Sequence, residues 1–502
     1  MSNLKIGWSE VDITPSKKVS LAGQFAERIS QYIEKPLTAT ALAIESDGEQ
    51  LIMVSCDLVG VTWKLVCDVR EALKGNTLGI DPEKIVLSAI HTHTAYRPLG
   101  GQRGQAGGVI TNYRDMLKEF LKPDQKYVEK ENVSNNPEVS TSDENHALLL
   151  ERIPALIEEA WKNRVDGGFS NAFGRAAVGM CRRAAYNDGT AQMWGDTNTA
   201  VFTELEGGND SGIELLYVFD NAKKLTGIVV NLACPAQCVQ HRLFVSPDFW
   251  GEVKMRLRKH FGEDIFMLPL CSAAGDQCPV DLVRWVEPES DLNDPNCKRI
   301  NPPKRKADPS MFDLAGMVKA GKRITNEIID TWDEGLDEAQ TDVEFSHRVI
   351  NMQLPIRRAT LTDVNKAKVA IKDYLSGVEG DIDYNDVANL QVHLGILRRF
   401  ALQEKLDTLT TEVHIVRIGT IAFATNPFEL FLDFGNQIKA RSNAEQTFLV
   451  QLANGTEGYL PTAKAESNGH YSAFIGSGQV GHIAGEQLVR ETLQNIREMF
   501  NK

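Results

Sequence analysis

The stretch Lys84-Ile-Val-Leu-Ser-Ala-Ile-His-Thr-His93 indicates both the fold class and the place of a site. Its run of apolar and small residues is typical of a strand buried on both faces. The run ends in His91 and His93, which are two residues apart and so project from the same face of an extended chain. Imidazole is the commonest metal ligand and the usual general base. We therefore expect a buried strand that delivers both histidines to one cleft; two surface histidines in a turn are the alternative.

Five further apolar runs share this organisation, because each is short and leads into residues able to carry chemistry. They are Leu51–Cys56 before Asp57, Leu225–Ala233 before Cys234, Ile265–Cys271 before Asp276, Val416–Ala424 before Glu429, and Thr447–Ala453 before Tyr459. Segments of helical pattern alternate with these runs. The alternation predicts an α/β fold, with a mixed β-sheet core and surrounding helices. Ligands of such sheets bind beyond the carboxyl ends of the strands, so we expect the active site at the strand C-terminal ends.

These segments are spread along the whole chain, so a shared site requires one catalytic domain over residues 1–502. Two long polar stretches, 99–145 and 284–311, are predicted to be loop insertions. Residues 360–405 have a helical pattern and are predicted to form a helical block. The sequence leaves the oligomeric state open, a homo-oligomer included.

Composition and charge exclude several classes of protein. The chain has 42% hydrophobic and 24% charged residues, as ordinary globular proteins do, and a formal net charge of −14. This charge disfavours a nucleic-acid partner or an anionic membrane. No run of apolar residues is long enough for a transmembrane helix, and the opening residues lack an apolar targeting segment. Eight sparse cysteines fit a reducing compartment, so we expect a cytoplasmic protein.

Common catalytic motifs are missing from the sequence. It contains no phosphate-binding loop, no dinucleotide-binding glycine pattern, no nucleophile elbow and no His-Glu-x-x-His. Nucleotide binding and serine hydrolase chemistry therefore lose support.

Several single residues allow two interpretations each. Asp57 can fix the tautomer of an imidazole or cap a turn. Glu429 is a metal ligand or a glutamate in the first turn of a helix. Arg182 binds a carboxylate or an oxyanion, or is solvated. Cys278 is a nucleophile only if a base stabilises its thiolate. The spacing of Cys234-Pro-Ala-Gln-Cys-Val-Gln-His241 differs from that of zinc fingers, so buried thiols are the simpler interpretation.

Taken in order, these segments resemble the catalytic domain of the neutral/alkaline non-lysosomal ceramidase family. The matching motifs are Gly7-Trp-Ser-Glu-Val-Asp-Ile-Thr-Pro15, Val54-Ser-Cys-Asp57, Leu87-Ser-Ala-Ile-His-Thr-His93, Asn231-Leu-Ala-Cys-Pro235, Gly275-Asp-Gln-Cys-Pro279, Asn426-Pro-Phe-Glu429 and Asn454-Gly-Thr-Glu-Gly-Tyr459. The resemblance implies an α/β catalytic domain that uses a zinc ion to hydrolyse an amide bond.

The resemblance also implies roles for individual residues. His91, Glu429 and Tyr459 are expected to bind zinc, with Cys234 where the family has its second histidine ligand. The catalytic residues are expected to be His93 as general base, with Tyr471 and Arg182 on the scissile carbonyl. Asp57, Asp276 and Cys278 are expected to bind the substrate or to hold the ligands and catalytic residues in place.

The sequence departs from the family pattern at three places. A cysteine, Cys234, replaces the second histidine, Cys278 replaces a serine, and the chain ends without the family's C-terminal β-domain. We therefore expect a zinc-dependent hydrolase that cleaves an amide-type bond of a small or medium soluble substrate rather than ceramide. The alternatives are a metal-dependent hydrolase of glycosidic or ester bonds, and a binding protein that has lost the metal.

Overall fold

The largest of the β-sheets organises the molecule. In the computed structural model, which describes residues 4–24, 27–98, 113–128, 136–283, 312–335 and 339–501, this sheet has eight strands. They are β1 (Lys5–Asp12), β3 (Thr38–Ser46), β4 (Glu49–Cys56), β5 (Ile85–Ala89), β6 (Val165–Arg175), β11 (Gly212–Asp220), β12 (Leu225–Leu232) and β14 (Phe266–Cys271). Their order is β14-β12-β11-β6-β1-β3-β4-β5. The pairs β4–β5 and β12–β14 are parallel and the other neighbours antiparallel, which confirms a mixed sheet.

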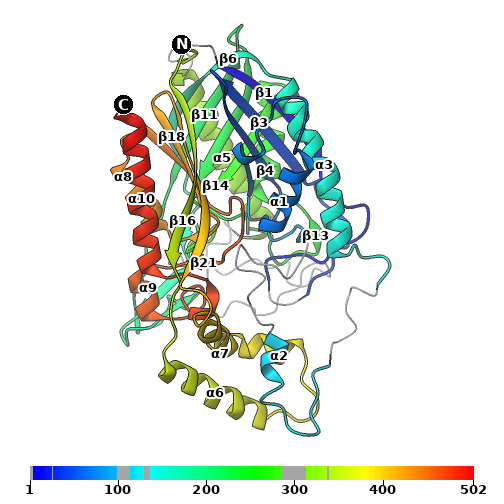
Figure 1. Ribbon diagram of the computed structural model, residues 1–502, viewed down its shortest axis with the longest axis vertical. Coiled ribbons are helices and arrows are strands. Elements are labelled where there is room, and N and C mark those ends of the chain that lie inside the picture. Colours follow the sequence, from blue (N-terminus) through cyan, green and yellow to red (C-terminus); the bar gives the residue numbers. More distant parts are fainter. Residues whose placement is uncertain are drawn as a thin grey trace.

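A second sheet lies against the first (Figure 1). Its four strands, in the order β16-β17-β18-β20, are β16 (Phe345–Pro355), β17 (Thr408–Ile418), β18 (Ile421–Thr425) and β20 (Gln446–Val450). Side chains alternate in these strands, so Phe423 and Phe448 point between the sheets and stack with their ring centroids 4.7 Å apart. They share one buried cluster with Trp8 and Leu42 of the larger sheet.

Helices cover the outer face of each sheet (Figure 1). On the larger sheet, α1 (Trp63–Ala72) and α3 (Ser142–Lys162) cover the half that contains β3 to β5, while α4 (Phe249–Phe261) and α5 (Asp313–Gly335) cover the half around β11 and β12. On the smaller sheet lie α8 (Leu432–Arg441) and α10 (His482–Phe500). The predicted α/β fold with surrounding helices is confirmed. None of the helices in the described ranges is long and apolar enough to cross a membrane.

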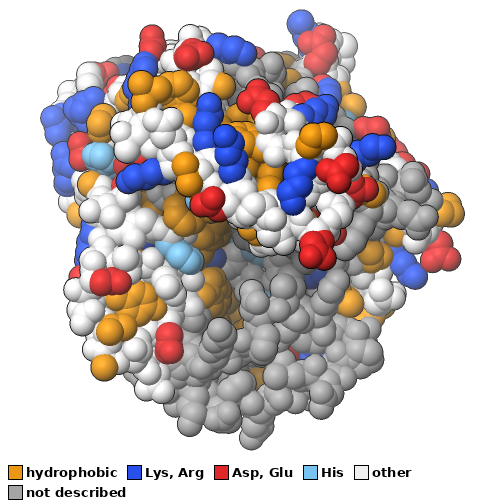
Figure 2. Space-filling view, turned by 90° about the horizontal axis from the view of Figure 1, so that it is seen from below, with side chains coloured by type: hydrophobic (Ala, Val, Ile, Leu, Met, Phe, Trp, Pro, Cys, Tyr) orange, Lys and Arg blue, Asp and Glu red, His pale blue; other side chains and the backbone are white. Residues whose placement is uncertain are grey.

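A small helical block forms the lower end of the molecule in Figure 1. It consists of α2 (Tyr113–Leu117), α6 (Leu361–Ser376) and α7 (Tyr384–Leu402), which share a buried cluster of their own. Helices α6 and α7 lie within the predicted block 360–405, and α2 lies within the predicted insertion 99–145. Residues 99–112, 129–135 and the whole insertion 284–311 are outside the described residues. From this end, described charges of both signs are interspersed with apolar side chains (Figure 2).

Short elements connect the layers and include the segments that build the site. They are β2 (Tyr32–Ile33), β7 (Met180–Cys181), β8 (Arg183–Tyr186), β9 (Ala191–Met193), β10 (Phe202–Leu205), β13 (Phe244–Val245), β15 (Gln277–Cys278), β19 (Glu429–Leu430), β21 (Tyr459–Leu460), α9 (Ala463–Asn468), and the 3₁₀ turns η1 (Pro82–Lys84) and η5 (Ile475–Ser477). Strands β19 and β21 pair in parallel, with Glu429 beside Tyr459. This pairing brings together two residues that are 30 positions apart in the sequence.

Candidate active site

His91 lies just beyond the end of β5 and its ring orientation is fixed. Its backbone is in the left-handed region, with φ of +62°, which turns the chain out of the strand. The ring Nδ1 lies 2.6 Å from the carbonyl oxygen of Val59. A carbonyl only accepts hydrogen bonds, so Nδ1 donates to it and Nε2 is directed into the site. There Nε2 lies 3.5 Å from Oε2 of Glu429.

Glu429 and Tyr459 reach the site from the paired strands β19 and β21. Burial opposes ionisation of Glu429, but the neighbouring His91 and Arg182 and a hydrogen bond from Tyr459 hold the pKa of its carboxyl below the usual range. Burial raises the pKa of the Tyr459 phenol well above its usual value, and the charge of Glu429 adds to this. The pair is therefore a carboxylate and a protonated phenol near neutral pH.

His93 lies next to His91, with 3.4 Å between the two Nε2 atoms. Burial and the positive charges of Arg28 and Arg182 hold the pKa of His93 well below its usual value, so the ring is neutral at pH 7. One face of the ring packs on Gly23, where a Cβ atom would lie only 2.4 Å from the ring. A neutral, immobilised imidazole at this position is suited to accept a proton.

Arg182 connects the remaining parts of the site. Its guanidinium donates to the carbonyl of Gly275 at 3.0 Å and lies 3.4 Å from the phenol oxygen of Tyr459. The phenol of Tyr459 in turn lies 3.3 Å from that of Tyr471. The predicted residues His91, His93, Glu429, Tyr459, Tyr471 and Arg182 are thus linked in one chain of contacts.

Gln237 is the member of this group that sequence reasoning missed. Its Oε1 accepts from Arg182 at 3.2 Å, and its Nε2 lies 2.7 Å from Nε2 of His93. Because the arginine can only donate, the amide oxygen faces it and the amide nitrogen faces the histidine. An amide has no sequence signal of its own; the only hint was its place in the turn after Cys234.

The Cys234 thiol hydrogen-bonds to backbone carbonyls and to none of these side chains. Its thiol contacts the carbonyls of Val178, at 3.7 Å, and Pro235, at 3.5 Å, inside the core around β11 and β12. Burial raises the pKa of the Cys234 thiol well above its usual value, which disfavours the thiolate that a metal would need. His241, the other ligand considered, lies 3.3 Å from the side chain of Gln24.

The three residues expected to support the site have different partners. Asp57 accepts from Thr38 and, at 3.0 Å, from Lys254, so the carbonyl of Val59 and not Asp57 orients His91. The carboxylate of Asp276 accepts from the backbone of Leu432 at 2.9 Å, and its burial raises its pKa to about 6. The thiol of Cys278 donates to the carbonyl of Val280 at 3.2 Å.

A cation at the site would suit some of these groups. Nε2 of His91 and a carboxylate oxygen of Glu429 face each other at 3.5 Å, and both atoms can coordinate a metal ion. Tyr459 adds a third oxygen beside them. Among the described residues, however, no group of three or more His, Cys, Asp or Glu side chains is arranged to hold a metal ion. The donors that lie side by side are those of His91, Glu429 and Tyr459, and the thiol of Cys234 forms its hydrogen bonds elsewhere.

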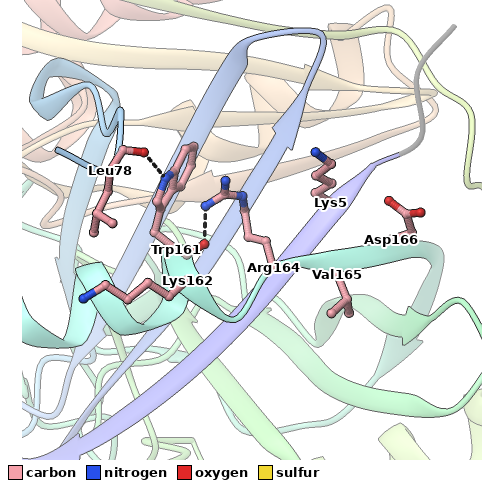
Figure 3. A pocket seen from close by; sticks show the side chains of 7 residues that line it. All are labelled: Lys5, Leu78, Trp161, Lys162, Arg164, Val165 and Asp166. Atoms are coloured by element: carbon pink, nitrogen blue, oxygen red, sulfur yellow. Dashed lines mark hydrogen bonds between the residues drawn. The ribbon is translucent and has the colours of Figure 1, made fainter.

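A shallow hollow of the surface lies away from the predicted site residues. It is lined by residues at the end of α3 and the start of β1 and β6, where Arg164 stacks on the ring of Trp161 and the indole nitrogen donates to the carbonyl of Leu78 at 2.9 Å (Figure 3). It contains none of the predicted site residues and its polar groups are largely paired, so we assign no role to it.

Comparison with known proteins identifies the fold. A neutral ceramidase from Pseudomonas aeruginosa superimposes with a TM-score of 0.67 and 17% identity, over 100% of this chain and 75% of that chain. A ceramidase complexed with C2 gives a TM-score of 0.64 and 15% identity, over 100% and 76% of the two chains. No protein-family model and no curated sequence matches. The resemblance seen in the scattered motifs is thus confirmed at the level of the fold, which this chain shares with neutral ceramidases.

Proposed function

We propose that this protein is a zinc-dependent hydrolase of amide-type bonds in small or medium water-soluble substrates. The observation that carries the proposal is the convergence of His91, Glu429 and Tyr459 with His93 at the strand ends of a ceramidase-type fold. Fold alone does not fix chemistry, so the side chains carry the argument.

His91, Glu429 and Tyr459 would hold the metal. Imidazole nitrogen and carboxylate oxygen favour zinc over calcium or magnesium. When bound, zinc polarises a carbonyl and lowers the pKa of water towards neutrality. Ligands bind metals in their deprotonated forms, so Tyr459 would have to release its proton on binding.

The other residues would bind the substrate and move protons. His93 is neutral and buried, so it can accept a proton from the attacking water and return one to the leaving amine. Arg182 and Tyr471 would donate hydrogen bonds to the carbonyl oxygen as negative charge develops on it. The Nε–H of Arg182 has no partner among the described residues, so a donor is available there.

The surface supports a soluble substrate rather than a lipid in a bilayer. The net charge of −14 opposes anionic membranes, and the described side chains at the lower end mix both signs of charge. We extend this to a cytoplasmic location, which fits the sparse cysteines.

The test is a substrate panel on protein of known metal content. N-acyl amino acids, N-acyl sugars, long-chain ceramide in detergent, esters and glycosides are compared, with release of amine, acid or sugar as the signal. We expect turnover of soluble N-acyl compounds and little of ceramide. Exclusive turnover of glycosides or esters, or undiminished activity in metal-free folded protein, would contradict the proposal.

A further inference from the structure

The turn that carries Tyr471 has an unusual backbone. Gly469, His470 and Ser472 have φ of +73°, +69° and +73°, all in the left-handed region. For His470 and Ser472 this conformation is strained, and strain of this kind persists only where the surroundings impose it. The turn therefore needs an external support.

Arg183 provides that support. Its side chain has no exposed area, and its guanidinium donates to the carbonyls of Gly469 at 2.8 Å and Tyr471 at 2.9 Å. A third hydrogen bond reaches the hydroxyl of Ser472 at 3.2 Å. The planar fork of an arginine holds three acceptors in one fixed geometry, which a lysine cannot do.

Glu206 fixes the guanidinium from the opposite side. Its carboxylate binds Nε of Arg183 and, at 3.1 Å, a second guanidinium nitrogen, and its side chain is 4% exposed. The same carboxylate accepts from Asn468, at the end of α9, at 3.0 Å. A buried ion pair gains little net stability after desolvation, so stability alone does not explain it.

The supported turn sets the position of one phenol. The rings of Tyr471 and Tyr459 meet edge to face, with centroids 5.3 Å apart, and their oxygens lie 3.3 Å apart. We propose that Arg183, held by Glu206, is a positioning residue that aims the Tyr471 phenol at the reacting carbonyl. This inference rests on the proposed function, because the orientation of the Tyr471 phenol matters only if a reaction takes place at the site.

The first test needs no substrate. Crystal structures of Arg183→Met and of a matched control, Arg70→Met, are compared with the wild type. Arg70 is also a buried arginine paired with a carboxylate, that of Glu412 at 2.8 Å. We expect the 469–472 turn to change conformation and the contact between the two phenols to be lost in Arg183→Met alone. An unchanged turn in Arg183→Met would overturn the proposal.

The second test is a double-mutant cycle on the rate. Tyr471→Phe and Arg183→Met should each lower kcat by about 100-fold, the typical effect of losing one donor to a developing oxyanion. If Arg183 acts through Tyr471, the double variant falls no further than the single variants. Additive losses, near 10⁴-fold, would overturn the proposal.

Arg183→Lys keeps the inference testable if Arg183→Met does not fold. It keeps the charge opposite Glu206 but loses the fork, so we expect stability near that of the wild type with a displaced turn and the same loss of kcat. Full activity of Arg183→Lys would overturn the positioning role. If the wild type hydrolyses no amide, the proposed function fails, and the crystal structures still decide whether Arg183 positions Tyr471.

Discussion

The described residues include two buried clusters with a pair of histidines, and we propose chemistry for one of them. At the site, His91 and His93 lie beyond the end of a strand. In the second cluster, His347 and His414 lie within β16 and β17, and their rings meet with Nε2 of His347 2.8 Å from Nδ1 of His414. Similar residues thus occur in two different settings.

The two clusters differ in how completely their polar atoms are paired. In the second, the other ring nitrogens contact the carbonyl of Gln50 at 2.8 Å and the carboxylate of Glu412 at 2.9 Å, and Arg70 pairs with that carboxylate. At the site, within the described ranges, Nδ1 of His93 has no partner, whereas both ring nitrogens of His347 and of His414 are bound. The Nε atoms of Arg182 and of Arg70 lack a partner alike, so the two clusters differ at their histidines.

The largest expected effect separates the clusters by activity. His91→Ala or Glu429→Ala should lower the rate of amide hydrolysis by about 10³-fold or more, because each removes a group that would hold the metal. His347→Gln, the matched change in the second cluster, should stay within a few-fold of the wild type. Steady-state kinetics on the best substrate of the panel measures both. An equal loss of rate in His347→Gln would contradict the difference in role between the two clusters.

The free energy of unfolding should respond in the opposite order, with the larger loss for a change in the second cluster. Glu412→Gln leaves the buried Arg70 with only the exposed carboxylate of Glu83, at 3.8 Å, and breaking a buried pair costs about 3–5 kcal/mol. Urea unfolding followed by circular dichroism gives the free energy of unfolding. Glu429→Gln serves as the control and should cost less, since the contact of Glu429 with His91, at 3.5 Å, is longer than the 2.8 Å pair of Glu412 with Arg70. A larger loss of unfolding free energy in Glu429→Gln than in Glu412→Gln would contradict the comparison.

The second cluster also predicts a pH dependence of stability. Burial alone would raise the pKa of Glu412, but hydrogen bonds and charges from His414 and Arg70 lower it to about 2. A depressed pKa in the folded state stabilises the protein above the unfolded pKa, and this contribution is lost as pH falls towards the folded pKa. The stability gap between wild type and Glu412→Gln should therefore shrink between about pH 4.5 and pH 2. A gap that widens on acidification would contradict this.

The smallest effect concerns Cys278. Its thiol donates to the carbonyl of Val280 at 3.2 Å. Cys278→Ser should retain activity within about 10-fold of the wild type, since a hydroxyl can make the same hydrogen bond. Mass spectrometry of stopped reactions should find no substrate-derived adduct on this residue. An adduct would recast the protein as a thiol hydrolase.

The sequence was informative wherever a pattern depends on local spacing. Short continuous apolar runs such as Ile85–Ala89 predicted buried strands, and the ends of these runs predicted an active site at the strand C-terminal ends. The pairing of Glu429 with Tyr459, by contrast, came from the resemblance, because a parallel contact of two short strands leaves no local signal.

Residues whose roles depend on distant partners could not be predicted. Gln237 and Arg183 are bound by residues far away in the sequence, and neither residue type marks a site by itself. Cys234 follows the end of an apolar run just as His91 does, and for this reason it was expected to bind the metal. In the structure, the side chain of Cys234 contacts the carbonyl of Val178 in the core. The direction of a side chain just after a strand depends on the turn that follows, which sequence spacing does not define.

Zinc binding tests the central claim most directly. Metal-free wild type, Glu429→Ala, Cys234→Ala and Glu412→Gln are titrated with zinc, with bound metal measured after dialysis and tyrosinate absorbance followed in parallel. We predict one zinc per chain in the wild type, in Cys234→Ala and in Glu412→Gln, with a tyrosinate signal from Tyr459, and loss of binding in Glu429→Ala. Zinc that binds Glu429→Ala as tightly as the wild type, or that is lost in Cys234→Ala, would contradict the site described here.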